Sequence, residues 1–291
     1  HGEDAPCREI SPERCARCFA RSPYGALLGL GRVTGNVGGD GLLQDAARAA
    51  GALRRVLPTG FGPASRLLGL LGNSAASPSQ VSRRLERARA AVRLVDRLVA
   101  PSRAMAETMI RLGAPAEKVE VSDYGFEPMT LPPRAPRSGR LRLGFVGTLV
   151  PHKGADLLLQ AARELPPDSF EVRVHGDPGV SPDHGARLRR LARGMPVRLA
   201  GPFAPGDAPS IYAGIDCLVV ASRWPENSPL VIHEAFQAGI PVVAPDVGGC
   251  AELVRHGVNG LLFRAGSARS LARQLRCLVE RPALVEDLAR E

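Results

Sequence analysis

The residues best suited to chemistry lie in two short loops, each of which follows an apolar run. The first loop, Gly147 to Gly154, contains Lys153, one of only two lysines in the chain. The second loop contains Glu226, and Glu234 follows it with seven residues in between. A lysine ammonium can bind a phosphate, and carboxylates accept hydrogen bonds from the vicinal hydroxyls of sugars. The pattern permits one extended ligand that carries both phosphate and sugar groups.

The sequence around both loops also favours an anion site at a helix start. The two glycines of the first loop permit tight backbone turns. In the second loop Ser228 is a suitable N-cap and Pro229 a suitable first helical residue, so open N–H groups follow. A structural interpretation stays open at this point, in which the lysine is solvated and the two acids only cap the helix or face water.

From residue 141 onwards, apolar runs typical of strands alternate with segments of helical periodicity. Strands are predicted at 141–147, 170–175, 197–200, 217–221, 241–244 and 261–263. Helices are predicted at 155–164, 185–193, 209–213, 229–238, 251–256 and 268–278. Such alternation over short loops implies a parallel sheet covered on both faces, with ligands bound at the carboxyl ends of the strands.

The first part of the chain is less regular. Residues 1–75 have poor periodicity and predict loops and short helices, followed by a helix at 77–95, a strand at 97–100, a helix at 102–112 and a strand at 119–122. Five prolines and glycines between Pro128 and Arg140, with almost no apolar pattern, predict a linker at 128–140.

The segment from Ser222 to Phe263 contains W-P-E-N-S-P-L-V-I-H-E-A-F with its E-x7-E spacing, then G-I-P-V-V-A, G-G-x-x-E-L-V and N-G-L-L-F. This segment resembles the signature of the retaining nucleotide-sugar glycosyltransferases of glycosyltransferase family 4. Residues 141–154 resemble the family's G-R-L-x-x-x-K-G phosphate loop, and residues 99–125 resemble its stretch of A-P-S, K-V and Y-G. The likeness covers nearly the whole chain, strongly from Leu141 and loosely before it.

The resemblance implies an α/β fold of two facing Rossmann-like domains, the GT-B type, with the active site in the cleft between them. Residues 1–127 would be a partial N-terminal, acceptor-side domain, and 141–265 the C-terminal domain that binds the nucleotide sugar. Residues 266–291 would be a truncated C-terminal helix region. Because only two strands precede the linker, we expect roughly 90 to 120 residues of the first domain to be missing.

By matching position, the resemblance also assigns roles to single residues. Glu226 would contact hydroxyls of the transferred sugar, Glu234 the ribose hydroxyls, and Lys153 the diphosphate; Glu226 and Lys153 are the expected catalytic residues. Further donor-binding residues are expected at Gly147, Thr148, Gly154, Phe203, Arg223, Asn227, Ser228, Pro229 and Leu230, with Gly248 and Gly249 lining the cleft. His1 would match a first-domain histidine near the acceptor.

The chemistry implied is transfer of a hexose-type unit from a nucleotide sugar to a saccharide or lipid-linked acceptor, with retention of configuration, in bacterial polysaccharide biosynthesis. Lys153 and a helix N-terminus could stabilise the charge that develops on the distal phosphate. We therefore expect no metal and no cofactor. Because the leaving phosphate is commonly held to assist front-face attack, no protein nucleophile is named.

The chain departs from the family pattern at Thr148, where the family usually has arginine. This removes one cation from the expected diphosphate clamp, and Arg223 could compensate. An alternative is therefore a non-catalytic nucleotide-sugar-binding scaffold of the same fold. A two-domain epimerase or phosphorylase of similar architecture is a weaker alternative.

The net charge of +9 and the pI near 9.9 do not identify a nucleic-acid partner. Arginines are spread along the chain and aromatic residues make up only 4% of it, so the interleaved basic and aromatic platforms of single-strand binders are absent from the sequence. We expect no nucleic acid, a cytoplasmic location, and a peripheral contact with anionic membranes as an open alternative.

The six cysteines do not suggest a disulfide framework. Cys7, Cys15 and Cys18 form a C-x7-C-x2-C pattern, and whether they bind zinc is left open because a second close pair is missing. Cys217, Cys250 and Cys277 are interpreted as small apolar core residues.

Overall fold

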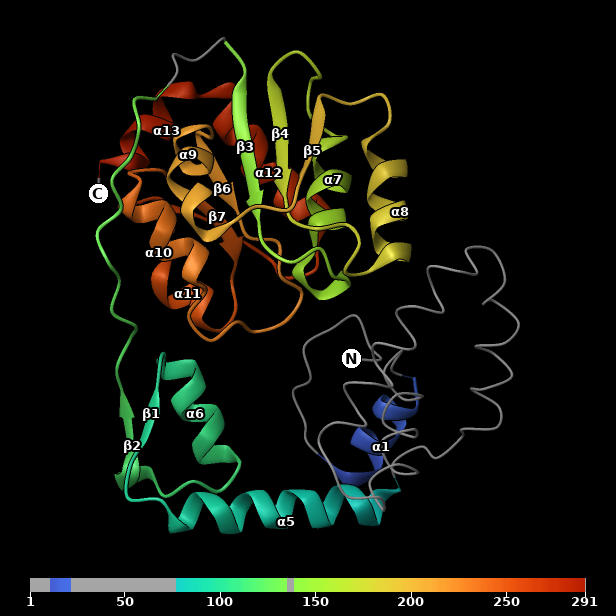
Figure 1. Ribbon diagram of the computed structural model, residues 1–291, viewed down its shortest axis with the longest axis vertical. Coiled ribbons are helices and arrows are strands. Elements are labelled where there is room, and N and C mark those ends of the chain that lie inside the picture. The colour runs from blue at the N-terminus through green and yellow to red at the C-terminus, as the bar shows by residue number, and fades with distance from the viewer. Residues whose placement is uncertain (1–10, 22–76, 135–138, 291) are drawn as a thin grey trace. The chain divides into compact units, whose positions relative to one another are not determined.

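The computed structural model describes residues 11–21, 77–134 and 139–290 of the 291-residue chain (Figure 1). The chain divides into two compact units, His1–Ala91 and Val92–Glu291. In the first unit, the described residues form helix α1 (Pro12–Arg21) and most of α5 (Pro78–Leu94), which continues across the boundary. The predicted helix at 77–95 is confirmed, and its start has the expected reciprocal contacts between Ser77 and Gln80.

A small α/β segment opens the second unit. Strands β1 (Leu98–Ala100) and β2 (Val119–Val121) pair in parallel, connected by α6 (Arg103–Arg111) and a 3-10 turn at Ala116–Lys118. Lys118, the other lysine of the chain, donates from Nζ to the carbonyls of Arg93 and Val95 at 3.0 and 2.8 Å. It therefore fixes the chain around β1 and β2.

The rest of the second unit is built on a six-stranded parallel sheet. Its strands are β3 (Leu141–Val146), β4 (Phe170–His175), β5 (Val197–Gly201), β6 (Cys217–Val219), β7 (Val242–Pro245) and β8 (Gly260–Phe263). They lie in the order β5-β4-β3-β6-β7-β8, with parallel pairing throughout. This is the Rossmann order, whose direction reverses between β3 and β6, where such sheets bind ligands.

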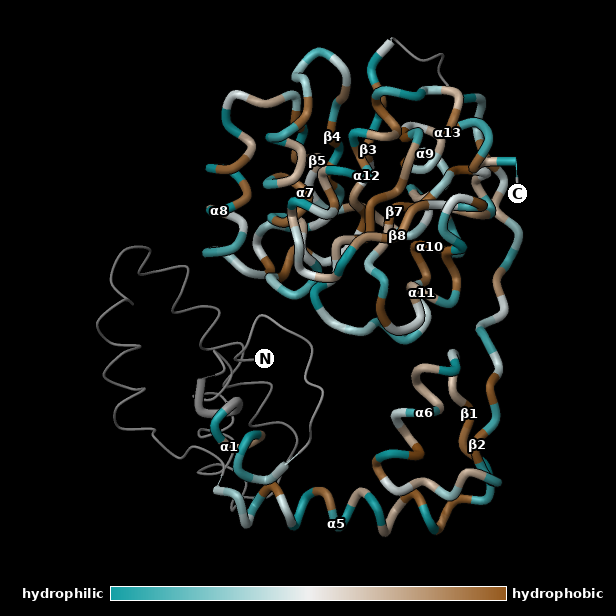
Figure 2. The backbone as a smooth tube through the Cα atoms, turned by 180° about the vertical axis from the view of Figure 1, so that it is seen from behind, coloured by the Kyte–Doolittle hydropathy of each residue, from teal (hydrophilic) through white to brown (hydrophobic). Residues whose placement is uncertain are grey.

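Helices cover both faces of this sheet (Figure 1). One apolar cluster joins the sheet to α7 (Ala155–Ala162), α8 (Pro182–Ala192), α12 (Ala268–Glu280) and α13 (Pro282–Ala289). A second cluster joins it to α9 (Ala208–Ala213), α10 (Leu230–Gln237) and α11 (Gly249–Leu253). All residues of β6 and β7 are buried, as expected for strands covered on both faces, and Figure 2 shows the hydrophobic stretch at β7.

The predicted alternation of strands and helices is confirmed, and with it the α/β class with a Rossmann-like C-terminal domain. Most predicted bounds differ from the structure by at most two residues, two helix boundaries differ by three, and one helix was missed. Helix α8 begins at Pro182, since that proline occupies the first turn. Helix α11 ends at Leu253 because the Asn259 side chain accepts from the Arg255 N–H and forms a turn. Helix α13, which begins with Pro282, was not predicted.

The predicted domain boundary at 128–140 stays a prediction, as do the truncated ends. Within the linker, the Met129 N–H donates to Oε1 of Gln237 on α10 at 2.8 Å. In the ranges that the structure describes, no helix is long and apolar enough to cross a membrane, and no group of histidine, cysteine and acidic side chains could hold a metal ion. His1 and Cys7 lie outside those ranges.

The interpretation of the later cysteines as core residues fits the structure. Cys217 and Cys250 are fully buried, and Cys277 is partly buried on α12. Burial raises the pKa of the Cys250 thiol to about 12, so it stays protonated and unreactive near neutral pH.

Candidate functional site

Lys153 and Glu226 meet at the carboxyl ends of β3 and β6. Lys153 lies in the 3-10 turn Pro151–Lys153 after β3, and Glu226 lies in the loop after β6. Lysine Nζ is 2.7 Å from Oε1 of Glu226, with 35% of the lysine side chain and 12% of the glutamate side chain exposed. Ser222, which is buried, donates its hydroxyl to the same oxygen. The structure thus brings the two expected catalytic side chains together at the switch point of the sheet.

The backbones of the two loops are in contact, which sets the spacing of the chain positions that carry these two side chains. Gly154 has a φ of 75°, and a Cβ built there would lie 1.9 Å from the carbonyl oxygen of Ala221 in the loop after β6. The Arg223 N–H also donates to the carbonyl of His152 at 2.8 Å. The ring of His152 lies 4.4 Å from that of Trp224. Glycine is therefore required at 154 both for its φ and for the close approach.

Arg223 holds the first loop rather than projecting into open space. Its guanidinium donates to both carboxylate oxygens of Asp156 on α7, at 2.8 and 3.0 Å, and to the carbonyl of Pro151. Asp156 also pairs with Arg187 at 3.2 Å. Burial would raise the pKa of Asp156, but the hydrogen bonds and charge of Arg223 outweigh it and lower the pKa below its usual value. The carboxylate is therefore charged and structural.

Glu234 lies on α10 and is held by a tyrosine that the sequence did not indicate. The hydroxyl of Tyr212, on α9, donates to Oε2 of Glu234 at 2.6 Å and lies 3.4 Å from the carbonyl of Val231. Burial, reinforced by the neighbouring carboxylate, raises the pKa of Tyr212 far above its usual range. The phenol therefore remains a donor at any pH at which the protein works.

The start of α10 differs from the prediction. Pro229 is the N-cap and has no side-chain cap, so Ser228 as N-cap and Pro229 as first helical residue were both one position early. The buried Ser228 hydroxyl instead lies 2.7 Å from Oδ1 of Asp123 and 2.8 Å from Nε2 of His233. The ring of Phe126 stacks on His233 at 4.3 Å. The first N–H groups of the helix are left without a side-chain acceptor.

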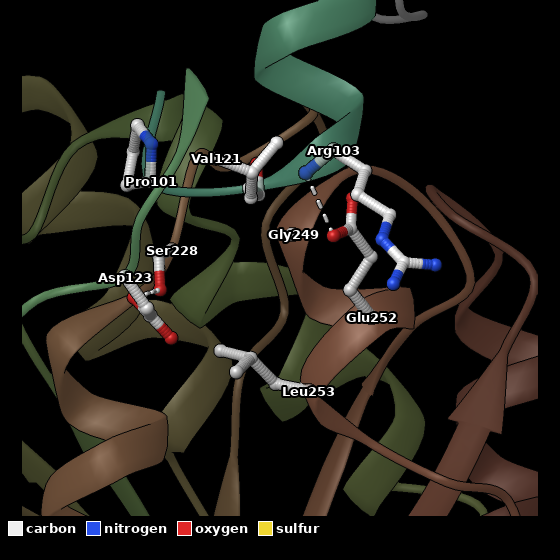
Figure 3. A pocket seen from close by; sticks show the side chains of 9 residues that line it. Pro101, Arg103, Val121, Asp123, Ser228, Gly249, Glu252 and Leu253 are labelled. Carbon is white, nitrogen blue, oxygen red and sulfur yellow. Dashed lines mark hydrogen bonds between the residues drawn. The ribbon is translucent and has the colours of Figure 1, made fainter. Parts of the chain in front are cut away.

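A pocket of about 410 Å³ lies beside Ser228 (Figure 3). One side of its lining comes from the β1–β2 segment and the other from the sheet domain; the lining residues are Pro101, Ser102, Arg103, Val121, Asp123, Ser228, Gly249, Glu252 and Leu253. The Glu252 carboxylate accepts from the N–H groups of Arg103 and Ala104 at 2.8 and 2.6 Å, which satisfies two free amides at the start of α6. Figure 3 shows this carboxylate directed at the Arg103 nitrogen.

The predicted cleft glycines lie against the Glu226 loop. The Gly249 N–H donates to the carbonyl of Glu226 at 2.8 Å, and a Cβ at Gly249 would lie 1.7 Å from the Asn227 carbonyl oxygen. Gly248 has a φ of 59°. A side chain at Gly249 would force this turn away from the Glu226 loop, and Gly249 also lines the pocket beside Ser228.

The remaining predicted donor residues lie at the same edge of the sheet. Gly147 and the exposed Thr148 follow β3 directly, and Asn227 and Leu230 are exposed at the start of α10. Phe203, in the loop after β5, packs edge-on against His175 at 6.3 Å. Because burial lowers the pKa of His175, that ring is neutral at physiological pH.

Sequence reasoning missed the residues that hold the predicted ones, namely Ser222, Tyr212, Asp156, Asp123 and Glu252. Tyr212 is 22 residues from its partner and Asp123 is 105 residues from Ser228, so no local spacing could have joined them. Only the capping-like position of Glu252 in the G-G-x-x-E-L-V segment gave a hint, and its partners are 148 and 149 residues away.

This fold and these motifs agree with comparisons to known proteins. Residues 140–281 match the family described as glycosyl transferases group 1. The C-terminal part of the chain therefore has the fold and the sequence pattern of a glycosyltransferase group 1 domain.

Particular relatives share the same region. The chain is 34% identical over 218 residues to the D-inositol 3-phosphate glycosyltransferase of Rhodococcus opacus, a match that covers 67% of this chain and 48% of the relative. The structure of the present chain is similar to that of Alr3699/HepE of Anabaena in complex with UDP and glucose. The TM-score is 0.62 and the identity 28%, and the match covers 70% of this chain and 59% of the other.

Sucrose-phosphate synthase from Thermosynechococcus elongatus shares the fold, with a TM-score of 0.64, 23% identity, and 72% and 55% of the two chains covered. The chain spans about half the length of the curated relatives that it matches.

Proposed function

We propose that this chain is the donor-binding part of a retaining glycosyltransferase of family 4, which transfers a hexose-type sugar from a nucleotide sugar to a saccharide or lipid-linked acceptor. The observation that carries the proposal is the contact between Lys153 and Glu226 at the switch point of a Rossmann-like sheet. A cation and an acid at that place match the two ends of a sugar–diphosphate. The UDP and glucose bound by Alr3699/HepE support this donor class.

In the proposed reaction, negative charge develops on the distal phosphate as the anomeric bond breaks. Lys153 and the uncapped N-terminus of α10 stabilise that charge. Glu226 binds hydroxyls of the transferred sugar, and Glu234 binds the ribose. The proposal assigns no role to a metal, cofactor or protein nucleophile. The cytoplasmic location, the membrane contact and the acceptor site at His1 stay predictions.

A second candidate is a nucleotide-sugar-binding scaffold without turnover. It is favoured by Thr148, which provides no cation, together with Arg223, whose guanidinium is bound by Asp156 and Pro151. Calorimetry with UDP, GDP and ADP and their glucose conjugates, followed by a hydrolysis assay, separates binding from turnover. Binding without any product would favour the scaffold.

The test of the enzyme is Glu226→Ala in the whole protein, with Glu280→Ala on α12 as the matched control. We expect the first variant to lose at least 100-fold in transfer rate, because hydrogen bonds to a charged group that strengthen in the transition state contribute about 1.5–3 kcal/mol each. The control, whose side chain is exposed, should transfer normally. Unchanged turnover in Glu226→Ala would reject the assigned role.

A further inference from the structure

Both glutamates of the proposed site are held by a hydroxyl group, and in both cases only one carboxylate oxygen is used. Tyr212 binds Oε2 of Glu234, while Ser222 and Lys153 both bind Oε1 of Glu226. Among the described residues, no other donor reaches Oε1 of Glu234 or Oε2 of Glu226. Each acid therefore presents one oxygen that a ligand hydroxyl can use.

The two hydroxyls are themselves fixed in place. Tyr212 is fully buried on α9, in the apolar cluster on the face of the sheet that α10 covers. Ser222 lies in the loop after β6 and is only 1% exposed. A buried hydroxyl has few alternative partners, so its hydrogen bond to a carboxylate restricts the side-chain torsions of a flexible glutamate. Half-buried glutamates without such a donor would sample several rotamers.

We propose that Tyr212 and Ser222 are positioning residues, which orient Glu234 towards the ribose and Glu226 towards the transferred sugar. This inference rests on the proposed function. It assigns separate parts of the donor to separate hydroxyls, since of the two acids Tyr212 binds the one on α10 and Ser222 the one in the loop. Loss of Tyr212 should change how the nucleoside is bound, and loss of Ser222 should change the transfer step.

Tyr212→Phe removes one hydroxyl and keeps the buried ring, so the variant should fold. The probes are UDP, GDP and ADP, of which the tightest binder is then compared with its 2′-deoxy analogue by calorimetry on the 291-residue chain. We expect the wild type to prefer the ribose form by about tenfold, as is typical of a hydrogen bond to a charged group, and Tyr212→Phe to reduce that preference to threefold or less. Tyr124→Phe, at a half-exposed tyrosine, is the matched control and should keep the full preference.

The outcomes of this experiment are distinct. If the wild type binds none of the three diphosphates, the proposed function fails. If it binds one of them without preferring ribose, or if Tyr212→Phe keeps the preference within twofold of the wild type, the role of Tyr212 is rejected although the function stands. If Tyr212 had only a structural role, the variant would bind the ribonucleotide and its 2′-deoxy analogue more weakly by the same factor, and the ratio of the two affinities would stay unchanged.

Ser222→Ala provides the second, independent measurement. In the whole protein we expect kcat for transfer to fall at least tenfold while the KM for the donor changes less than threefold, because Lys153 still pairs with Glu226 but one restraint on the carboxylate is gone. The affinity for the nucleoside diphosphate should stay within twofold of the wild type. A kcat within threefold of the wild type would overturn the assignment of Ser222.

Discussion

Two ion pairs join the same neighbouring strands, β3 and β6, at opposite ends of the sheet. At the amino ends, Arg142 donates to Asp216 from its Nε, its Nη2 and its backbone N–H, at 2.7–2.9 Å. The two side chains are only 6% and 1% exposed. At the carboxyl ends, Lys153 and Glu226 share one contact, with 35% and 12% of their side chains exposed. Arg142 binds both carboxylate oxygens of Asp216, whereas Lys153 binds only Oε1 of Glu226 and leaves its Oε2 available to a ligand.

The comparison shows how one kind of contact can serve structure at one end of a sheet and ligand binding at the other. A fully satisfied, buried pair cannot exchange partners without leaving a charge in the core. A half-open pair can exchange the lysine–carboxylate contact for lysine–phosphate and carboxylate–hydroxyl contacts. Variants of each pair should therefore change different properties, stability at one end and ligand affinity at the other.

The largest expected effect is at the amino ends. Asp216→Asn leaves the buried Arg142 guanidinium without its counter-ion, so the free energy of unfolding should fall by about 3–5 kcal/mol, measured by urea denaturation. Asp168→Asn, which disrupts the exposed pair between Arg140 and Asp168, is the control and should show no measurable change. Equal stability of the two variants would contradict the structural role of Asp216.

Lys153→Met tests the opposite end. The change removes the only expected side-chain cation of the diphosphate site but keeps the length of the side chain. We expect the affinity for the tightest-binding nucleoside diphosphate to fall about 10- to 100-fold, the range for a charged hydrogen bond, with little change in stability. Titration calorimetry measures the first and urea denaturation the second. A large loss of stability with unchanged affinity would show that the Lys153–Glu226 pair serves stability and not ligand binding, which would contradict the comparison.

Glu226→Gln should have a smaller effect of opposite sign. The amide keeps the shape of the side chain but no longer neutralises Lys153, so the ammonium is freer to bind phosphate. We expect the affinity for the nucleoside diphosphate alone to rise about threefold, well within the range of a partly exposed ion pair. A weaker affinity would show that Glu226 supports the diphosphate site directly.

A further prediction concerns the pH dependence of stability at Asp156, which supports the Lys153 loop. Because its pKa is lower in the folded than in the unfolded protein, the carboxylate contributes stability above the unfolded pKa of ~3.9, and this contribution is lost as the pH falls through the folded value. The difference in unfolding free energy between the wild type and Asp156→Asn should be constant above about pH 5 and shrink below about pH 4. A difference that is independent of pH would reject this assignment.

The sequence predicts the sheet well because the strands are short, rich in apolar residues and bounded by turn residues. All six residues of β3 are buried, and the apolar Leu141, Leu143, Phe145 and Val146 among them are typical of a strand. Lys153 and Glu226 were predictable as neighbours because loops that follow adjacent parallel strands meet at one edge. The resemblance to a known family supplied the roles, which periodicity alone could not.

Tertiary contacts explain what the sequence did not predict. Ser228 has the residue type of an N-cap, but its hydroxyl binds Asp123 and His233, so the helix starts later. Arg223 is a loop arginine that could equally have faced a phosphate, and its contacts with Asp156 on α7 and with the carbonyl of Pro151 decide its orientation. Side-chain partners far apart in sequence are set by packing, which local patterns do not encode.

The missing side chain at Gly154 has a mechanical consequence. With backbone directly against the backbone of Ala221, the two loops have no intervening side chain whose rotation could absorb a displacement. A displacement of the backbone at Gly154 must therefore move the backbone after β6 as well. The chain positions that carry Lys153 and Glu226 thus keep a constant spacing, and only the two flexible side chains adapt to a ligand.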